Sequence, residues 1–381
     1  MVMFVNLMPD RTLTDSQGCK VKPICTRRTH STFRVRGARI NFGIQSVFNS
    51  TSAQHHTTYR AAQCTELKKP LVLQDVAAAE LKPAEVRVAV HFCGVNFADI
   101  LVCQGLYQEK PPLPFIPGME FSGCVVETGQ NVVEFQKGDR VIGVGGSGMA
   151  EQCVVDQKML WKIPNELSYE EATALPVSYG TGLLALKHRA ATQVGETVLV
   201  TAAAGAAGLA AVDIASQALQ AKVIAAAGSD EKCAIAVQKG AFASINYTTC
   251  NLKEELKKLT NNEGVNVVFD TVGGDIFKDA LSSLRWEGRI VVVGFAGGAI
   301  PSIPANLLLL KNISAMGVFW GRYREENFPL FSQSISQAIH LFQAGKIKPY
   351  IGATYKLPQV NQAFHHVLQR QSVGKVVVSM K

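Results

Sequence analysis

The chain has 381 residues, of which 47% are hydrophobic and 18% are charged, and its net charge is +8 at pH 7. This composition is typical of a folded globular protein and excludes an intrinsically disordered chain. The length allows one large domain or two ordinary ones. No apolar run reaches the roughly 20 residues that a transmembrane helix needs, so the sequence predicts no membrane span.

The excess positive charge is concentrated in residues 1–58. This segment holds eight Lys and Arg residues against two Asp, and the rest of the chain is close to neutral. A nucleic-acid-binding surface is therefore not expected. The basic, acid-poor and Ser/Thr-rich composition is typical of a mitochondrial targeting segment, cleaved somewhere between about residues 30 and 60. A basic tail on a cytoplasmic protein, or an overextended gene model, are the alternatives.

The cysteines indicate a reducing compartment. There are nine of them, scattered along the chain and without a C-x-x-C pair. This pattern favours free thiols and offers neither a disulfide framework nor a zinc cluster.

Residues 59–176 show the short alternating segments of a β-rich domain. VRVAVHF at 86–92 alternates like a half-buried strand, and SGCVVET and RVIGV follow between Gly and Pro turns. From Val177 the pattern changes to alternating strands and helices. Strands are expected at 197–201, 222–226, 265–270 and 288–294, and helices at 206–219, 230–238 and 276–284. Apolar strands joined by helices predict a parallel sheet covered on both faces.

The C-terminal part is expected to return to the first domain. Helices at 331–343 and 358–369 precede a final strand, GKVVVSM. The predicted fold class is therefore α/β. A β-rich catalytic domain would comprise residues 59–176 and 319–381, and a doubly wound cofactor domain would comprise residues 177–318.

A glycine-rich turn carries the strongest chemical signal. The strand at 197–201 leads into Ala202-x-x-Gly205-x-x-Gly208, where a helix is expected to begin. Gly205 would let the backbone approach a pyrophosphate, and Gly208 would let the helix pack against the strand. Ala202 replaces the usual first glycine, which we expect to be tolerated. Such a turn can serve packing alone, but the repeated strand–helix units favour nucleotide binding.

The end of the second strand indicates which nicotinamide cofactor is bound. NAD-binding units place an acidic residue there, whereas this chain has Ala227, followed by Ser229 and Lys232. A hydroxyl and a cation suit the 2′-phosphate of NADPH. Asp230 and Glu231 are assigned to the first turn of the following helix, where its dipole favours them. The alternative for Lys232 is a solvated surface lysine.

Eight stretches together resemble the zinc-free quinone oxidoreductase (zeta-crystallin-like) branch of the medium-chain dehydrogenase/reductase superfamily. They are CGVNFADI (93–100), GLYQEKPPLPFIPGMEFSG (105–123), GDRV (138–141), ALPVSYGTGLLAL (174–186), VFDTVGG (268–274), GRIVVVGF (288–295), IPANLLLLKN (303–312) and GKVVV (374–378). The resemblance covers nearly everything after residue 60. It implies a GroES-like catalytic domain, a Rossmann cofactor domain and a homodimer.

The resemblance also implies roles for individual residues. Asn96, Asp99 and Tyr107 match positions that line the substrate cleft, and we expect them to be catalytic. The residues implied in NADPH binding are Thr181, Ala202, Gly205, Gly208, Ser229, Lys232, Tyr247, Phe295 and Asn306. Asn96 and Asp99 could instead cap a short helix, and the Asn306 side chain could form hydrogen bonds to backbone groups only.

A catalytic metal is not expected. The zinc-ligand positions of zinc-dependent relatives fall at 94–96, 119–120 and 177–178, where the chain has GVN, Met119-Glu120 and Val177-Ser178. Zinc sites need Cys, His or several carboxylates, and Glu120 alone cannot hold the ion.

The sequence thus predicts an NADPH-dependent oxidoreductase that reduces quinones or α,β-unsaturated carbonyls. The alternative is an NADPH-binding protein with little turnover and a structural, sensing or RNA-binding role. Leu101 and Cys103 favour that alternative, because some members of the family carry Tyr and Arg at these positions. A methyltransferase that uses the same glycine turn is disfavoured, since it has no use for IPANLLLLKN or the closing domain.

Overall fold

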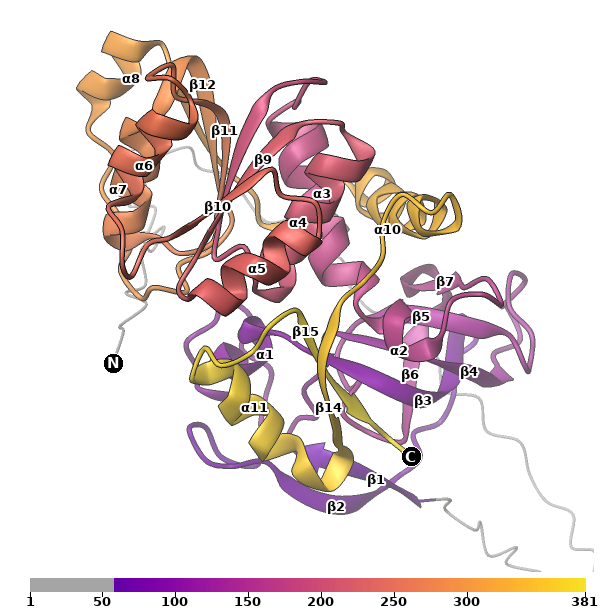
Figure 1. The fold of residues 1–381 in the computed structure, drawn as a ribbon. Coiled ribbons are helices and arrows are strands. Elements are labelled where there is room, and N and C mark those ends of the chain that lie inside the picture. Colours follow the sequence, from indigo (N-terminus) through magenta and orange to yellow (C-terminus); the bar gives the residue numbers. More distant parts are fainter. Residues whose placement is uncertain (1–57) are drawn as a thin grey trace, which may run out of the picture. The chain divides into compact units, whose positions relative to one another are not determined.

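The computed structural model describes residues 58–381, so the expected targeting segment lies outside the described residues, apart from Thr58. In this part of the chain the strands form a seven-stranded sheet, a six-stranded sheet and a two-stranded hairpin (Figure 1). The hairpin consists of β1 (Thr58–Gln63) and β2 (Val72–Ala77). No helix between residues 58 and 381 is long and apolar enough to cross a membrane.

The seven-stranded sheet has the order β14-β15-β3-β4-β5-β7, with β6 paired to β3. Its strands are β3 (Glu85–Val95), β4 (Glu120–Thr128), β5 (Arg140–Val144), β6 (Gln152–Asp156), β7 (Leu160–Lys162), β14 (Ile351–Lys356) and β15 (Lys375–Ser379). The last strand of the chain lies antiparallel to β3, with Val376 opposite Val95. This pairing brings the C-terminal segment next to the end of β3, where the site begins.

The six-stranded sheet is parallel throughout, in the order β10-β9-β8-β11-β12-β13. Its strands are β8 (Thr197–Thr201), β9 (Lys222–Ala227), β10 (Ala243–Asn246), β11 (Val265–Asp270), β12 (Leu284–Val292) and β13 (Ser314–Gly317). The strand order reverses at β8, between β9 and β11. Ligands of open α/β sheets bind at such a reversal, outside the carboxyl ends of the strands.

Helices cover both faces of the parallel sheet. They include α4 (Ala206–Asp213), α5 (Asp230–Gln238), α6 (Leu252–Leu259), α7 (Gly274–Ser282) and α8 (Ala305–Lys311). Alternate residues of β8 enter different cores: Val198 belongs to the same core as Leu209 of α4, whereas Leu199 belongs to the same core as Phe277 of α7. This alternation explains why the strands are apolar on both sides.

Two helical segments carry site residues between the sheets. The π-helical turn η2 (Leu175–Tyr179) continues into α3 (Gly180–Leu183) and the π-helical η3 (Leu184–Arg189), and a third π-helical turn, η4 (Ile214–Ala218), extends α4. The expected helix at 206–219 is therefore α4 with η4.

The segment after residue 318 contributes to both parts of the fold. Strands β14 and β15 belong to the seven-stranded sheet, with α11 (Val360–Leu368) packed on them. Helix α10 (Phe328–Gln343) packs against η2 and α3, and its Phe331 shares a core with Val198 of the parallel sheet. The predicted α/β fold class, a β-rich sheet with a doubly wound parallel sheet, is confirmed.

The glycine turn is tied directly to the start of β15. The N–H of Gly374 donates to the carbonyl oxygen of Ala204 at 2.8 Å, and Gly205 forms a β-bridge with Gly374. The candidate phosphate-binding turn and the seven-stranded sheet therefore meet one residue before Lys375.

Candidate active site

Asn96 lies where β3 ends and α1 (Phe97–Cys103) begins. Both polar atoms of its side chain bond other side chains. Nδ2 donates to Oε1 of Glu120 at 2.9 Å, and Oδ1 accepts a hydrogen bond from Nζ of Lys375 at 2.7 Å. Asn96 is thus held by two charged residues, each of which begins a different strand.

Glu120 and Lys375 form a buried ion pair at this point. Glu120 is 0% exposed and begins β4, and Lys375 is 2% exposed and begins β15. The second carboxylate oxygen of Glu120 accepts the N–H of Val177 in η2 at 2.8 Å. Zinc-dependent relatives hold their ion with residues from three segments. In this chain, two of these segments supply Asn96 and Glu120, which both bond the Lys375 ammonium group. The third segment supplies the Val177 N–H, which bonds Glu120.

Lys375 has no catalytic motif around it that would single it out. The sequence shows only a lysine at the start of an apolar strand, GKVVV. This does not predict a buried lysine, because a long cationic side chain can reach solvent from most such positions. Its burial follows from the pairing of β15 with β3, which sequence periodicity does not reveal.

Asp99 is a second buried carboxylate beside Glu120, at 1% exposure. Its oxygens accept three backbone N–H groups, from Asn96 at 2.9 Å and from Gly118 and Met119 at 3.1 Å each. Burial raises the pKa of Asp99 to about 6, against the opposing effect of the bond from the Asn96 N–H. These contacts favour the capping role that the sequence left open, because the carboxylate joins the start of α1 to the loop before β4.

Tyr107 packs its ring edge-to-face with Phe319, with 6.1 Å between ring centroids. Burial raises the pKa of the Tyr107 hydroxyl to about 12, and the nearby Glu109 adds to the effect. The hydroxyl therefore stays protonated at neutral pH and can donate a hydrogen bond. Phe319, which follows β13, is 40% exposed. No sequence motif marks it.

The glycine turn leads directly from β8 into α4. Gly205 is the N-cap of α4, and Ala202 adopts a left-handed backbone with φ of 45°. A Cβ at Gly208 would overlap the carbonyl oxygen of Ala202, so glycine is needed there for helix packing. Ala202 is accommodated, but in a conformation that glycine adopts more readily.

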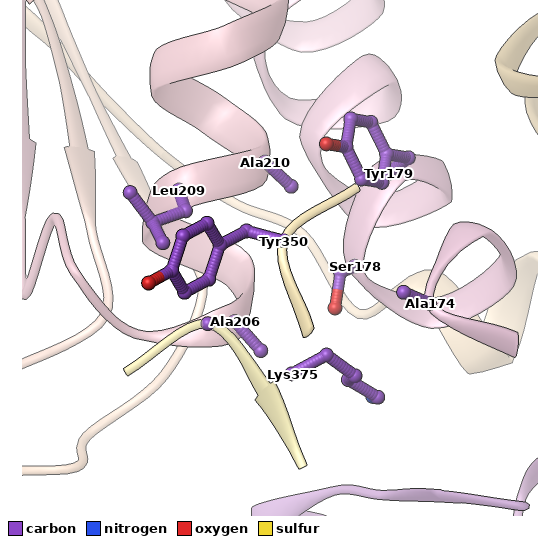
Figure 2. Close-up of a pocket in the computed structure, with 9 residues that line it drawn as sticks. Ala174, Ser178, Tyr179, Ala206, Leu209, Ala210, Tyr350 and Lys375 are labelled. Carbon is purple, nitrogen blue, oxygen red and sulfur yellow. The ribbon is translucent and has the colours of Figure 1, made fainter. Parts of the chain in front are cut away.

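A small cavity lies between this turn and the ion pair. It is lined by Ala206 at the start of α4, Ser178 of η2, Tyr350 and Lys375, among others (Figure 2). Thr181, expected near the nicotinamide, is buried in α3, which follows η2.

The three residues expected around the 2′-phosphate follow β9 and the adjacent strand β10. Ser229 is the N-cap of α5 and accepts the N–H of Lys232 at 3.3 Å. The ring of Tyr247 lies beside Gly228. Nζ of Lys232 donates to the carbonyl oxygen of Arg370 at 2.6 Å.

Arg370 adds a second cation to this group. Burial raises the pKa of Tyr247, and the charge of Arg370 opposes this rise. Arg370 lies 138 residues after Lys232, in the segment that follows α11, and no local motif connects them.

The remaining two expected cofactor residues are more open. Phe295 is half-buried after β12, with its ring beside Gly273. Asn306 is exposed on α8. Elsewhere between residues 58 and 381, no group of three or more His, Cys, Asp or Glu side chains is arranged to hold a metal ion.

Comparison with known proteins agrees with this architecture. Residues 82–165 match the alcohol dehydrogenase GroES-like domain, and residues 206–339 match the family model described as zinc-binding dehydrogenase. A structure of quinone oxidoreductase from Pseudomonas syringae superposes with a TM-score of 0.78 at 27% identity, over 84% of this chain and 99% of that chain. A mycobacterial protein solved in complex with NADPH gives 0.78 at 26% identity, over 84% and 99%.

The chain belongs to the medium-chain dehydrogenase/reductase superfamily, among its quinone oxidoreductase-like proteins. It is 64% identical to quinone oxidoreductase-like protein 2 of Bos taurus over 85% of this chain and 93% of that protein. It is 31% identical to human quinone oxidoreductase over 84% and 97%. It is therefore an oxidoreductase with a GroES-like domain and a Rossmann domain that binds a nicotinamide cofactor.

The raised pKa of Asp99 predicts a specific pH dependence of stability. Its folded pKa of about 6 lies above the ordinary value of 3.8, so folding favours the protonated form. The stabilisation is complete below pH 4 and is lost as pH rises through 6. The free energy of unfolding of the wild type, minus that of Asp99→Asn, should fall by about 2–3 kcal/mol between pH 4 and 7.

Urea denaturation at several pH values measures this difference. The same substitution at the exposed Asp75 of β2 is the matched control and should give a nearly constant difference. A constant difference for Asp99→Asn as well would show that its carboxyl titrates alike in the folded and unfolded chain.

Proposed function

We propose that this oxidoreductase is a zinc-independent, NADPH-dependent reductase of quinones or α,β-unsaturated carbonyls. The observation that carries the proposal is the Asn96 amide, fixed by the buried Lys375–Glu120 pair in the segments where zinc-dependent relatives bind their ion. The site offers a neutral hydrogen-bond donor in place of a Lewis acid.

The residues of the Rossmann domain fit NADPH. The free N–H groups at the start of α4, around Gly205, would hold the pyrophosphate. Lys232 supplies a cation for the 2′-phosphate, the backbone of Arg370 adjoins it, and Ala227 leaves β9 without the acidic residue that would repel the phosphate. Nζ of Lys232 bonds a backbone carbonyl, which is a neutral partner that a phosphate oxygen can replace.

NADPH supplies a hydride, and a conjugated substrate accepts it on an electron-poor carbon while negative charge develops on the conjugated oxygen. Donors aimed at that oxygen stabilise the charge. Asn96 has a second N–H beyond the one bonded to Glu120, and Tyr107 keeps its hydroxyl proton because its pKa is about 12. The alkoxide of a simple alcohol carries its charge on one oxygen, unlike a conjugated product. Stabilising such localised charge favours a metal ion over a neutral donor.

A low-turnover NADPH-binding protein is the second candidate. Leu101 and Cys103 are buried in α1, so this helix presents apolar side chains where some relatives carry Tyr and Arg. This observation favours weak activity toward small benzoquinones.

We also propose that the chain forms a homodimer and is imported into mitochondria. For the dimer, β13 is an unpaired edge of the parallel sheet, and the neighbouring α8 exposes Leu309 (75%) and Leu310 (67%). An edge strand can pair with its own copy across a twofold axis and cover such a patch. For import, the support is the composition of residues 1–58.

Replacing Lys232 should change cofactor preference. Lys232→Ala is expected to weaken NADPH binding by about 1–3 kcal/mol, which corresponds to roughly 5- to 150-fold, because a charge-assisted bond to the 2′-phosphate is lost. NADH binding should be nearly unchanged. Titration calorimetry with both cofactors measures the effect, and Lys258→Ala on exposed α6 is the control. Equal losses for NADPH and NADH would mean that Lys232 acts through folding.

Removing the Asn96 amide should affect chemistry more than cofactor binding. Asn96→Ala is expected to lower turnover of enones and quinones by about 100-fold, the usual effect of losing one oxyanion donor. The NADPH dissociation constant should change by less than about threefold, because the amide bonds only Glu120 and Lys375. Steady-state NADPH oxidation measures the first quantity and calorimetry the second.

Asn131→Ala, at an exposed loop position, is the matched control. The wild type should not oxidise ethanol-like alcohols. Alcohol oxidation by protein that carries one zinc ion per chain would contradict the proposal. Failure to oxidise NADPH with any quinone or enone would favour the low-turnover binding protein.

A further inference from the structure

The buried Lys375–Glu120 pair needs an explanation beyond stability. Both side chains are almost completely removed from water, and removing charges from water costs several kcal/mol per ion. Well-packed apolar residues often give equal or greater stability at such a position. We propose that Lys375 and Glu120 are positioning residues that fix which way the Asn96 amide faces. This inference rests on the proposed donor role of Asn96.

The two charged partners select one orientation of the amide. The Lys375 ammonium can only donate hydrogen bonds, so the Asn96 atom that faces it must be the oxygen Oδ1. The ionised Glu120 can only accept, so the atom that faces it must be Nδ2. A rotated amide would place donor against donor and acceptor against acceptor. The second hydrogen of Nδ2 is left free to bond a substrate oxygen.

The pair is itself held rigidly by its surroundings. Glu120 is anchored through the Val177 N–H, at 2.8 Å. Gly94 packs directly against the pair, because a Cβ at this position would lie 2.5 Å from Oε1 of Glu120 and 2.7 Å from Cε of Lys375. Such packing leaves little room for either side chain to move.

The same lysine connects the donor to the cofactor turn. Gly374, one residue earlier, bonds the carbonyl oxygen of Ala204 at 2.8 Å, and Lys375 lines the small cavity with Ala206 of α4 (Figure 2). The Asn96 amide is therefore held in a fixed relation to the turn that would bind the cofactor pyrophosphate. Holding donor and cofactor in one frame is what positioning for hydride transfer requires.

The test replaces both members of the pair at once. A single replacement would leave an unpaired buried charge and can unfold the chain, whereas Lys375→Met with Glu120→Gln removes both charges at similar volume. This double variant should lower kcat by about 10- to 100-fold and change the NADPH dissociation constant by less than about threefold. In an Asn96→Ala background the same pair of replacements should change kcat by less than about threefold, because the amide is already gone.

The outcomes separate this inference from the proposed function. If Asn96→Ala alone leaves kcat unchanged, the donor role fails and the inference fails with it. If Asn96→Ala lowers kcat but the double variant does not, only the inference is overturned. The inference is also overturned if the loss of kcat in the triple variant equals the product of the losses caused by Asn96→Ala and by the double variant.

A second readout does not depend on turnover. In the chain without cofactor, labelled with ¹⁵N-asparagine, one side-chain amide proton of Asn96 should exchange slowly because it is bonded to Glu120. Both protons should exchange at similar, faster rates in the double variant. The Asn361 side-chain amide bonds both the N–H and the carbonyl oxygen of Leu71, so it serves as the internal control. Its exchange rates should be unchanged in the double variant. Equal protection of Asn96 in wild type and double variant would refute the positioning role.

Discussion

One buried ion pair, Lys375 with Glu120, constrains the whole site. It requires β15 to lie beside β3, β4 to begin at residue 120 and η2 to present the Val177 N–H. It also requires glycine at position 94. Gly374, one residue before Lys375, bonds the glycine turn through the carbonyl oxygen of Ala204, so the pair lies directly beside that turn. A protein that placed these charges less accurately would leave them buried and unpaired, at a cost of several kcal/mol.

The electrostatic character of the site follows from where this cation is held. A zinc ion with an open position contacts the reacting oxygen directly and can stabilise an alkoxide. The Lys375 ammonium instead bonds Asn96 and Glu120, so its influence on a substrate would pass through a neutral amide. Such a donor suits charge that is spread over a conjugated system, and it matches poorly with simple alcohols. The proposed substrate class follows from this difference between a metal ion that contacts the substrate oxygen and an ammonium group that acts through an amide.

Local patterns in the sequence predicted local structure well. The strand at 197–201, the helix at 230–238 and the glycine turn between β8 and α4 occur where periodicity and turn chemistry indicate them. The bond between Lys375 and Asn96 spans 279 positions, and no periodic signal carries that information. Asn96 and Asp99 are both common capping residues, so the sequence alone does not reveal that Asn96 bonds Glu120 and Lys375 whereas Asp99 accepts three backbone N–H groups. The same holds for Arg370 beside Lys232.

The most direct test of the account is the destination of the hydride. NADPH that carries deuterium at C4 of the nicotinamide would be incubated with the purified chain and a cyclic enone, in the presence of a zinc chelator, and the product analysed by NMR. We expect deuterium on the β-carbon, with a rate unaffected by the chelator, because the charge would be stabilised through Asn96 and Tyr107. Deuterium on the carbonyl carbon, formed at a rate that the chelator abolishes, would contradict it.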